Sequence, residues 1–262
     1  MENDKIISDD QEVAELMNNY FSNVVPLLDI QGYNYIYDRH SDEISNIINK
    51  FNTHSSIIKI KDSNIIDEPF FFSIPDLQEM ENEVIKLNNN KPTTDNNIPP
   101  KILKQNINIC TPYLTKIYGD SVNTENFPAA LKKGDITPGH KKGVTTDKGN
   151  YRPVSILPSV SKFFERNMYR DIDKYMQRYL SPSLCGFRKG YSTQHCLLVM
   201  LENFKKALDS NCNAAALLTD LSKSFDCIHH ELLIAKLSAY DFSHSALSYI
   251  YSYLKIDFKE QR

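Results

Sequence analysis

The sequence contains no apolar run of the roughly 18 residues that a membrane-spanning helix needs, and it does not begin with a signal-peptide pattern. These absences predict a chain that is neither inserted into a membrane nor exported. Hydrophobic residues make up 41% of the chain and charged residues 24%, which is typical of soluble globular proteins. We therefore expect an intracellular protein, nuclear or cytoplasmic. Its composition alone indicates neither a function nor an oligomeric state.

Cysteine is scarce, and its pattern excludes two kinds of cross-linked fold. The chain has five cysteines, an odd number, and none of them forms a Cys-x-x-Cys pair. This argues against a disulfide framework and against a closed zinc site. Because free cysteine is usually buried, we expect most of the five to be reduced core residues.

Charge of one sign does not dominate the chain, but the two signs are segregated along it. The net charge is −3. Residues 1–100 hold 7 Lys/Arg and 18 Asp/Glu, a net of −11, whereas residues 130–206 hold 15 and 6, a net of +9. A basic block can bind phosphates, because each neutralised phosphate releases counterions. Ordinary solvated helix faces would give the same count.

Apolar residues recur at helical spacing along most of the chain. The predicted helices cover residues 10–25, 74–87, 102–109, 112–122, 159–180 and 192–208, and two more follow His229. Ser73 or Asp76 can cap the second of them. Residues 132–158 instead carry short runs broken by glycine and proline, which predicts a β-hairpin with a flexible tip. The pattern as a whole predicts a helix-rich α+β fold.

Residues 214–220, Ala-Ala-Ala-Leu-Leu-Thr-Asp, form a continuous apolar run that ends on a carboxylate. Such a run predicts a strand covered on both faces. An aspartate at the exit of a buried strand can bind a metal ion, since the strand fixes the oxygen while the sheet edge admits substrate. Asp220 is therefore the first catalytic candidate. A strand-terminal aspartate can also start a turn or cap a helix.

Four stretches carry a family resemblance. Residues 218–233, Leu-Thr-Asp-Leu-Ser-Lys-Ser-Phe-Asp-Cys-Ile-His-His-Glu-Leu-Leu, resemble the first catalytic motif of reverse transcriptases from LINE-type (non-LTR) retrotransposons. Residues 135–142, 150–158 and 186–194 resemble other segments of the same family, in the same order. The resemblance extends over roughly residues 74–262.

The resemblance implies a right-hand polymerase with fingers, palm and thumb, whose palm holds two Mg²⁺ ions. It implies an RNA template, a DNA primer and dNTPs as partners. In this interpretation residues 1–73 are a linker-like region with one or more helices, and residues 74–131 are a helical segment before the fingers. Residues 132–212 form the fingers, and residues 213–262 begin the palm.

The same resemblance assigns roles to individual residues. Asp220 matches the first metal-binding carboxylate, and Phe225 matches the bulky side chain that excludes a ribose 2′ hydroxyl. The backbone amides of Lys223 and Ser224 match positions close to the triphosphate, although the family more often has alanine where Ser224 stands. Two further matches concern cations. Lys141 or Lys142, together with Arg152, matches a basic pair that grips the triphosphate, and Arg188 matches a residue near the template strand. The alternative role of Phe225 is plain core packing, and the alternative for the cations of the hairpin is that they are ordinary solvent-exposed charges.

Several other polar residues are expected to be structural. Asp226 fixes a turn or caps the next helix, and His229 and His230 mark a helix start. Adjacent helical histidines point about 100° apart and seldom share one metal ion. Asp9 and Asp10 precede a helix, where N-capping explains them.

The family's second catalytic motif, a β-hairpin with a Tyr/Phe-x-Asp-Asp tip, does not occur between Asp220 and Arg262. We expect the rest of the palm, the thumb and the preceding endonuclease domain to be missing. One carboxylate cannot hold two magnesium ions in catalytic geometry, so we expect the polypeptide alone to be inactive. A non-catalytic RNA- or DNA-binding remnant is a second interpretation, and an inert, partly folded product of a decayed element is a third.

Overall fold

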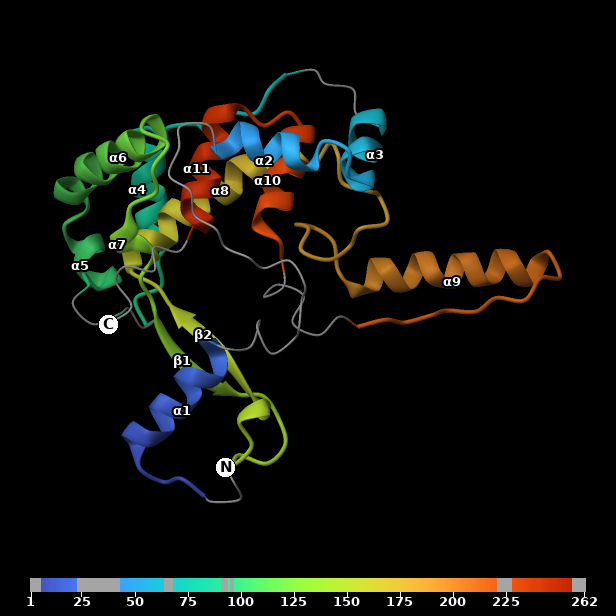
Figure 1. Ribbon diagram of the computed structural model, residues 1–262, viewed down its shortest axis with the longest axis horizontal. Helices are drawn as coiled ribbons and strands as arrows, with labels where there is room; N and C mark the ends of the chain where they lie inside the picture. Colours follow the sequence, from blue (N-terminus) through green and yellow to red (C-terminus); the bar gives the residue numbers. More distant parts are fainter. Residues whose placement is uncertain are drawn as a thin grey trace. The chain divides into compact units, whose positions relative to one another are not determined.

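The computed structural model describes residues 6–22, 43–63, 68–90, 94, 97–220 and 228–255 (Figure 1). The chain divides into two compact units. The larger comprises Met1–Asp171 together with Asp226–Arg262, and the smaller comprises Ile172–Phe225. Each unit is described by itself.

The described residues form a helix-rich α+β structure with one small antiparallel sheet. The helices are α1 (Asp10–Ser22), α2 (Glu43–Phe51), α3 (Ser55–Ser63), α4 (Leu77–Ile85), α5 (Pro100–Gln105), α6 (Ile107–Asn123), α7 (Ala129–Lys132), α8 (Ser159–Met176), α9 (Thr193–Asp209), α10 (His230–Ala239) and α11 (His244–Leu254). The strands are β1 (Asp135–His140) and β2 (Tyr151–Ile156), and η2 (Lys148–Asn150) is a 3₁₀ turn between them. No helix of the described part is long and apolar enough to cross a membrane.

An aromatic cluster forms the core of the larger unit. Tyr118 of α6 lies with its ring centroid 5.0 Å from that of Phe164 of α8, and Phe127 packs against both Phe164 and Tyr249 of α11. All four side chains are buried. Buried aromatic rings bring a large apolar area and favour edge-to-face contacts. They therefore join three helices that lie far apart in the sequence.

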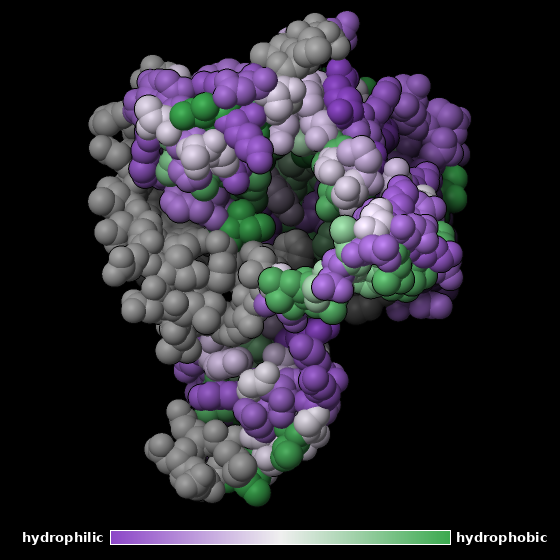
Figure 2. Space-filling view, turned by 90° about the vertical axis from the view of Figure 1, so that its right-hand side faces the viewer, coloured by the Kyte–Doolittle hydropathy of each residue, from purple (hydrophilic) through white to green (hydrophobic). Residues whose placement is uncertain are grey.

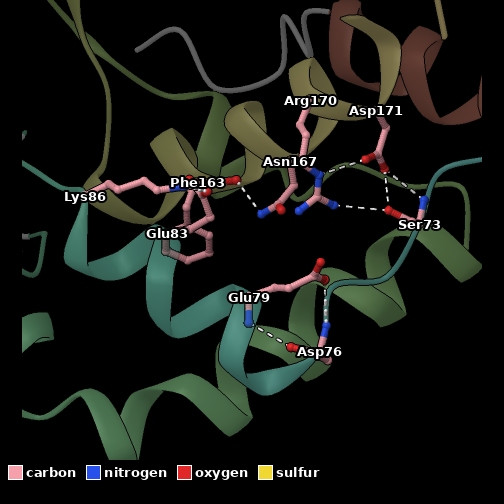
Figure 3. Close-up of polar contacts among 9 residues, drawn as sticks. All are labelled: Ser73, Asp76, Glu79, Glu83, Lys86, Phe163, Asn167, Arg170 and Asp171. Carbon is pink, nitrogen blue, oxygen red and sulfur yellow. Dashed lines mark hydrogen bonds and ion pairs between the residues drawn. The ribbon is translucent and has the colours of Figure 1, made fainter. Parts of the chain in front are cut away.

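Polar contacts join the segment before α4 to α8 (Figure 3). The backbone N–H and the hydroxyl of Ser73 both donate to Asp171 Oδ2, at 2.9 and 2.7 Å. Arg170 Nε donates to Asp171 Oδ1 at 3.0 Å, and its Nη2 donates to Ser73 Oγ at 3.1 Å. The charge-assisted bonds of Ser73 connect residues almost 100 positions apart.

A second contact region connects α2, α3 and α10. Lys50 at the end of α2 forms an ion pair with Glu231 of α10 at 2.6 Å, and the His229 ring lies 5.4 Å from that of Phe51. The backbone of Phe70 pairs with the loop between α10 and α11, accepting from Ser243 N–H and donating to Asp241 O. Ile44 and Ile47 are the buried residues of α2.

Most of the helix predictions are confirmed, with shifted ends. α4 begins after Asp76, which caps it, while Ser73 serves the contact with α8 instead. The predicted break before Pro112 is wrong, because α6 starts at Ile107 and runs through that proline. Proline's fixed φ is helical, and near a helix start its missing N–H removes one backbone hydrogen bond.

The prediction of a buried strand over residues 214–220 is wrong. These residues are irregular and exposed, with Leu217 91% and Leu218 89% accessible. A strand needs neighbouring strands to pair its backbone groups and neighbouring layers to cover its faces. In the part of the chain that the structure describes, the sheet consists of β1 and β2, neither of which pairs with this segment.

The expectation that most cysteines lie in the core is also wrong for the described ones. Cys196 and Cys212 are exposed, and Cys110 and Cys185 are half-buried. Cys196 belongs to α9, which has no buried residue. Leu197, Leu198 and Leu201 of the same helix are each more than half exposed. Hydrophobic side chains, in green, also lie among hydrophilic ones on the face of the molecule shown in Figure 2.

Candidate functional site

The pairing of β1 with β2 confirms the β-hairpin predicted within residues 132–158. Its register pairs Gly139 with Arg152 and His140 with Tyr151. Lys141 N–H donates to Asn150 O at 2.8 Å, which continues the ladder one step beyond the strands. Gly139 suits its place, because a Cβ there would lie 3.0 Å from a Val154 methyl group. The hairpin therefore fixes the backbones of both cation-bearing segments against each other.

Polar contacts order the tip of the hairpin. Asp147 accepts from Gly149 N–H at 2.8 Å, and the Asn150 amide donates to Val144 O at 3.0 Å. Gly143 has a φ of +89°, and a Cβ at this position would lie 2.7 Å from the Asn150 amide nitrogen. Only glycine adopts such a backbone without strain. The turn thus depends on Gly143 and returns the chain to β2.

Three cations of the predicted site lie on this hairpin. Lys141 and Lys142 follow β1 directly, and Arg152 lies on β2 opposite Gly139. All three are exposed. Exposed ammonium groups can meet a phosphate as point charges, and a guanidinium can meet it with two parallel hydrogen bonds. The hairpin thus brings together the basic pair predicted from the sequence.

Asp220 lies at the end of the irregular segment after α9 and is exposed. It belongs to the smaller unit, whereas the hairpin belongs to the larger one. The family resemblance implies that Asp220 and the hairpin cations belong to one nucleotide site, and this arrangement stays a prediction. The segment with Lys223, Ser224, Phe225 and Asp226 lies outside the described residues, so the roles assigned to these four stay predictions.

Arg188 makes contacts that the sequence did not indicate. Its Nε donates to Gln177 Oε1 at 2.9 Å, its Nη1 donates to Ser181 O at 3.2 Å, and its guanidinium lies 4.5 Å from the ring centre of Tyr191. A guanidinium has five N–H donors, so these two bonds leave capacity for a further acceptor. Phe187, next to it, has a φ of 57° and is 90% exposed. The arginine thus holds together the loop between α8 and α9.

The residues expected to be structural are found in capping positions where they are described. His229 Nδ1 accepts from Leu232 N–H at 3.2 Å, so His229 caps α10. Asp9 Oδ1 accepts from the backbone N–H groups of Gln11 and Glu12 at the start of α1. Burial lowers the pKa of His230, and the neighbouring His229 lowers it further. Both predictions of helix starts are confirmed.

A magnesium ion would need more ligands than the described residues offer. Among the residues that the structure covers, no group of three or more His, Cys, Asp or Glu side chains could hold a metal ion. Asp220 supplies a single exposed carboxylate. Mg²⁺ requires near-octahedral oxygen coordination. These residues therefore do not form a complete metal site.

Comparison with known proteins finds a family match for just under half of the chain. Residues 136–262 match the family model of reverse transcriptases (RNA-dependent DNA polymerases). The matched region begins in β1 and includes the hairpin cations, Arg188 and Asp220.

Three similar proteins come from Drosophila melanogaster. A probable RNA-directed DNA polymerase from transposon BS is 31% identical over 128 residues, covering 48% of this chain and 14% of that protein. A probable RNA-directed DNA polymerase from transposon X-element is 31% identical over 155 residues, covering 58% and 17%. The RNA-directed DNA polymerase from mobile element jockey is 26% identical over 182 residues, covering 65% and 19%. The chain thus spans less than a fifth of the length of these relatives.

Proposed function

We propose that this chain, whose residues 136–262 belong to the reverse transcriptase family of non-LTR retrotransposons, contributes the nucleotide-gripping fingers of an RNA-directed DNA polymerase. The supporting observation is the hairpin register, which places Arg152 beside the segment that carries Lys141 and Lys142. The partners would be an RNA template, a DNA primer and dNTPs, and the work would take place inside the cell.

The three hairpin cations would hold the triphosphate of the incoming dNTP. Arg152 would bind two phosphate oxygens through parallel N–H bonds, and the lysines would neutralise the charge on the others. Because the ladder fixes both strands, the cations would be positioned before the nucleotide arrives. Positioning and charge stabilisation are the main contributions a protein makes to phosphoryl transfer.

The remaining assigned residues complete the proposal. Reverse transcriptases generally use divalent metal ions, which stabilise the attacking and leaving oxygens when bound. Asp220 would give one carboxylate to such a cation, and further ligands would have to come from elsewhere. Lys223 and Ser224 would offer backbone N–H groups to the triphosphate, and Phe225 would exclude a 2′ hydroxyl. Arg188 would contact the template with the donors that Gln177 and Ser181 do not use.

Nucleotide-dependent binding of a template–primer tests this proposal. The affinity of the chain for an RNA–DNA template–primer with a dideoxy-terminated end would be measured with Mg²⁺ and with or without the next complementary dNTP. We expect the complementary dNTP to tighten binding by about threefold or more, since it joins the fingers to the primer end. A non-complementary dNTP should have no such effect.

A variant with Lys141→Gln, Lys142→Gln and Arg152→Gln should lose the response to dNTP. A control variant that removes two exposed lysines far from it in sequence, Lys59→Gln with Lys61→Gln, should keep it. The alternative function, a non-catalytic RNA- or DNA-binding protein, is favoured by the +9 net charge of residues 130–206. It would give salt-dependent binding that no dNTP alters, and that result would refute the polymerase proposal.

Primer extension by the 262-residue polypeptide itself is expected to be undetectable. A single candidate carboxylate cannot space two magnesium ions for in-line displacement. Purified chain would be incubated with template–primer, Mg²⁺ and dNTPs, and the products separated on a sequencing gel. Extension that Asp220→Ala abolishes would contradict this expectation.

A further inference from the structure

The larger unit carries a pocket that none of the assigned roles uses. Its volume is about 340 Å³, and it lies where the end of α4 and the start of α5 meet α8. Its lining consists of Leu87, Asn88, Pro100, Lys162, Glu165, Arg166 and Tyr169. Pockets that bind small molecules span roughly 300–1,000 Å³. The cavity is therefore large enough for a small ligand group and too small for a nucleic-acid duplex.

Two cations of α8 line this pocket one helical turn apart, Lys162 and Arg166. Arg166 Nη1 donates to the Glu83 backbone oxygen at 3.4 Å and lies 3.9 Å from the Glu83 carboxylate. That carboxylate also pairs with Lys86 at 2.6 Å. The Arg166–Glu83 ion pair is weak for two reasons: its atoms lie 3.9 Å apart, and the Arg166 side chain is 40% exposed, so that water screens its charge. The guanidinium is therefore held beside the pocket with capacity for another acceptor.

Two neighbouring cations are directed elsewhere. Arg170 is bonded to Asp171 and Ser73. Arg178, just beyond α8, lies over the ring of Tyr175 at 4.6 Å. Lys162 and Arg166 are the cations of α8 that line the pocket.

Tyr169 gives the pocket an aromatic wall. It follows Arg166 by three residues, so both lie on the same side of α8, and its side chain is 58% exposed. An exposed tyrosine beside cations offers a surface on which a nucleobase can stack. Leu87 and Pro100 are buried and supply an apolar floor.

Polar groups at the pocket are held in fixed positions. The Glu165 carboxylate accepts from the Tyr253 hydroxyl at 2.8 Å, and burial raises the pKa of Glu165. The Asn88 amide oxygen accepts from Asn90 N–H at 2.9 Å. The carboxylate is therefore bonded to α11 and also attracts Lys162, and the pocket combines a flat apolar side with a side that carries Lys162 and Arg166.

We propose that this pocket binds one nucleotide unit of single-stranded RNA, with the base stacked on Tyr169 and the adjoining phosphate at Lys162 and Arg166. The inference rests on the proposed function, since an RNA template is the single strand that such a polymerase holds. This RNA contact would be separate from the hairpin cations and from Asp220. A single strand fits because its unstacked bases can be splayed out onto an aromatic side chain.

Binding of a labelled 12-nucleotide oligouridylate to the full chain tests the pocket, measured by fluorescence anisotropy over a range of salt concentrations. Tyr169→Leu should weaken binding by about 5- to 100-fold, the range expected when one base no longer stacks. The double variant Lys162→Gln with Arg166→Gln should lower the slope of log affinity against log salt by about 0.7 for each phosphate that the chain no longer neutralises. With 5-bromouridine in the RNA, ultraviolet light should cross-link the strand to the peptide that contains Tyr169.

Matched controls separate these effects from folding and from net charge. Tyr113→Leu removes a comparably exposed aromatic ring on α6, 68% accessible, and should leave the affinity unchanged. Lys59→Gln with Lys61→Gln removes the same charge and should leave the salt slope unchanged. Equal effects of test and control variants, or cross-links that avoid the Tyr169 peptide, would overturn the inference. An oligoglutamate peptide that displaces the RNA, together with a silent Tyr169→Leu, would show a simple anion site and would also overturn it.

The outcomes distinguish this inference from the proposed function. If Tyr169→Leu is silent while complementary dNTP still tightens template–primer binding, the pocket inference is wrong and the polymerase proposal stands. If dNTP has no effect while Tyr169→Leu weakens oligouridylate binding, the pocket is an RNA site on a chain that is not a polymerase part.

Discussion

The buried Tyr249 contributes both ring packing and a hydrogen bond to the core of the larger unit. Its ring packs against Phe72 and Phe127, and its hydroxyl accepts from Ser121 Oγ at 2.9 Å. Burial raises the pKa of Tyr249 to about 12, and the Ser121 bond offsets part of that effect. A buried phenol is therefore kept neutral well into the alkaline range.

The raised pKa of Tyr249 makes stability depend on pH in a predictable direction. The native state holds this proton more tightly than the unfolded state, so the associated stability is complete below about pH 10 and is lost as pH rises towards 12. The free energy of unfolding of the Tyr249→Phe variant should therefore fall less steeply between pH 10 and 12 than that of the unsubstituted chain. Urea unfolding at several pH values measures this, with exposed Tyr113→Phe as the matched control. Equal slopes for Tyr249→Phe and the unsubstituted chain would contradict it.

Some features of the candidate site could be predicted from the sequence, and others could not. The hairpin that carries Lys141, Lys142 and Arg152 was predictable because glycines and prolines mark it, whereas the grouping of these three cations followed from the family resemblance. The partners of Arg188 were not, because a tyrosine and a glutamine carry no signal that points to an arginine. The bond of Ser73 to Asp171 spans 98 positions, and local patterns do not reveal such pairs.

At the scale of elements, the capping of α4 is a direct consequence of local sequence. Asp76 accepts from Glu79 N–H at 2.7 Å, and Glu79 accepts in turn from Asp76 N–H at 3.2 Å, as Figure 3 shows. This reciprocal pair satisfies two backbone donors that a helix start leaves unpaired.

Asp76→Ala should lower the free energy of unfolding by about 1 kcal/mol, because it removes the side-chain acceptor of the cap. Asp76→Asn should stay within a few tenths of a kcal/mol, since asparagine caps as well as aspartate does. Chemical denaturation of the three proteins measures the difference. An alanine variant as stable as the asparagine variant would show that the cap contributes nothing.

The hairpin turn gives a second element-scale prediction. Gly143→Ala should strain the tip, because of its φ of +89° and the close Asn150 amide, at a local cost of about 1–3 kcal/mol. Hydrogen exchange of the Lys141 amide, which bonds to Asn150 O, should then accelerate. Gly186→Ala is the matched control, because a Cβ there meets no atom within 4 Å. An unchanged Lys141 amide would argue against a glycine-dependent turn.

Amphipathic helices and the hairpin were predictable because their patterns are local. α2 and α3 were missed, although Ile44 and Ile47 are buried on one side of α2, since polar residues dilute the pattern around them. The apolar run before Asp220 was misassigned for the opposite reason. Its continuous apolar pattern is typical of a strand covered on both faces, but strand formation depends on partners that a run of seven residues does not specify.

At the scale of the molecule, the two units differ in how well their helices are buried. α6, α8 and α11 carry the aromatic core, whereas α9 has no buried residue and exposes several leucines. Most helical stability in proteins comes from packing of an apolar face. The smaller unit should therefore open at a lower free energy than the larger one.

Hydrogen exchange with mass spectrometry checks this difference. Peptides from α9 should exchange much faster than peptides from α6 at neutral pH, because opening of α9 exposes little buried apolar surface. Equal protection of the two helices would mean that α9 is covered in solution.

Photolabelling of the chain by dTTP shows whether the hairpin cations hold a nucleotide triphosphate, as a reverse transcriptase requires. The full chain, with Mg²⁺ and a template–primer that calls for dTTP, would be irradiated and the labelled peptides mapped by mass spectrometry. The account predicts a label within residues 135–156 that is lost in the variant with Lys141→Gln, Lys142→Gln and Arg152→Gln and reduced in Asp220→Asn. A label elsewhere, or one that these substitutions leave unchanged, would contradict it.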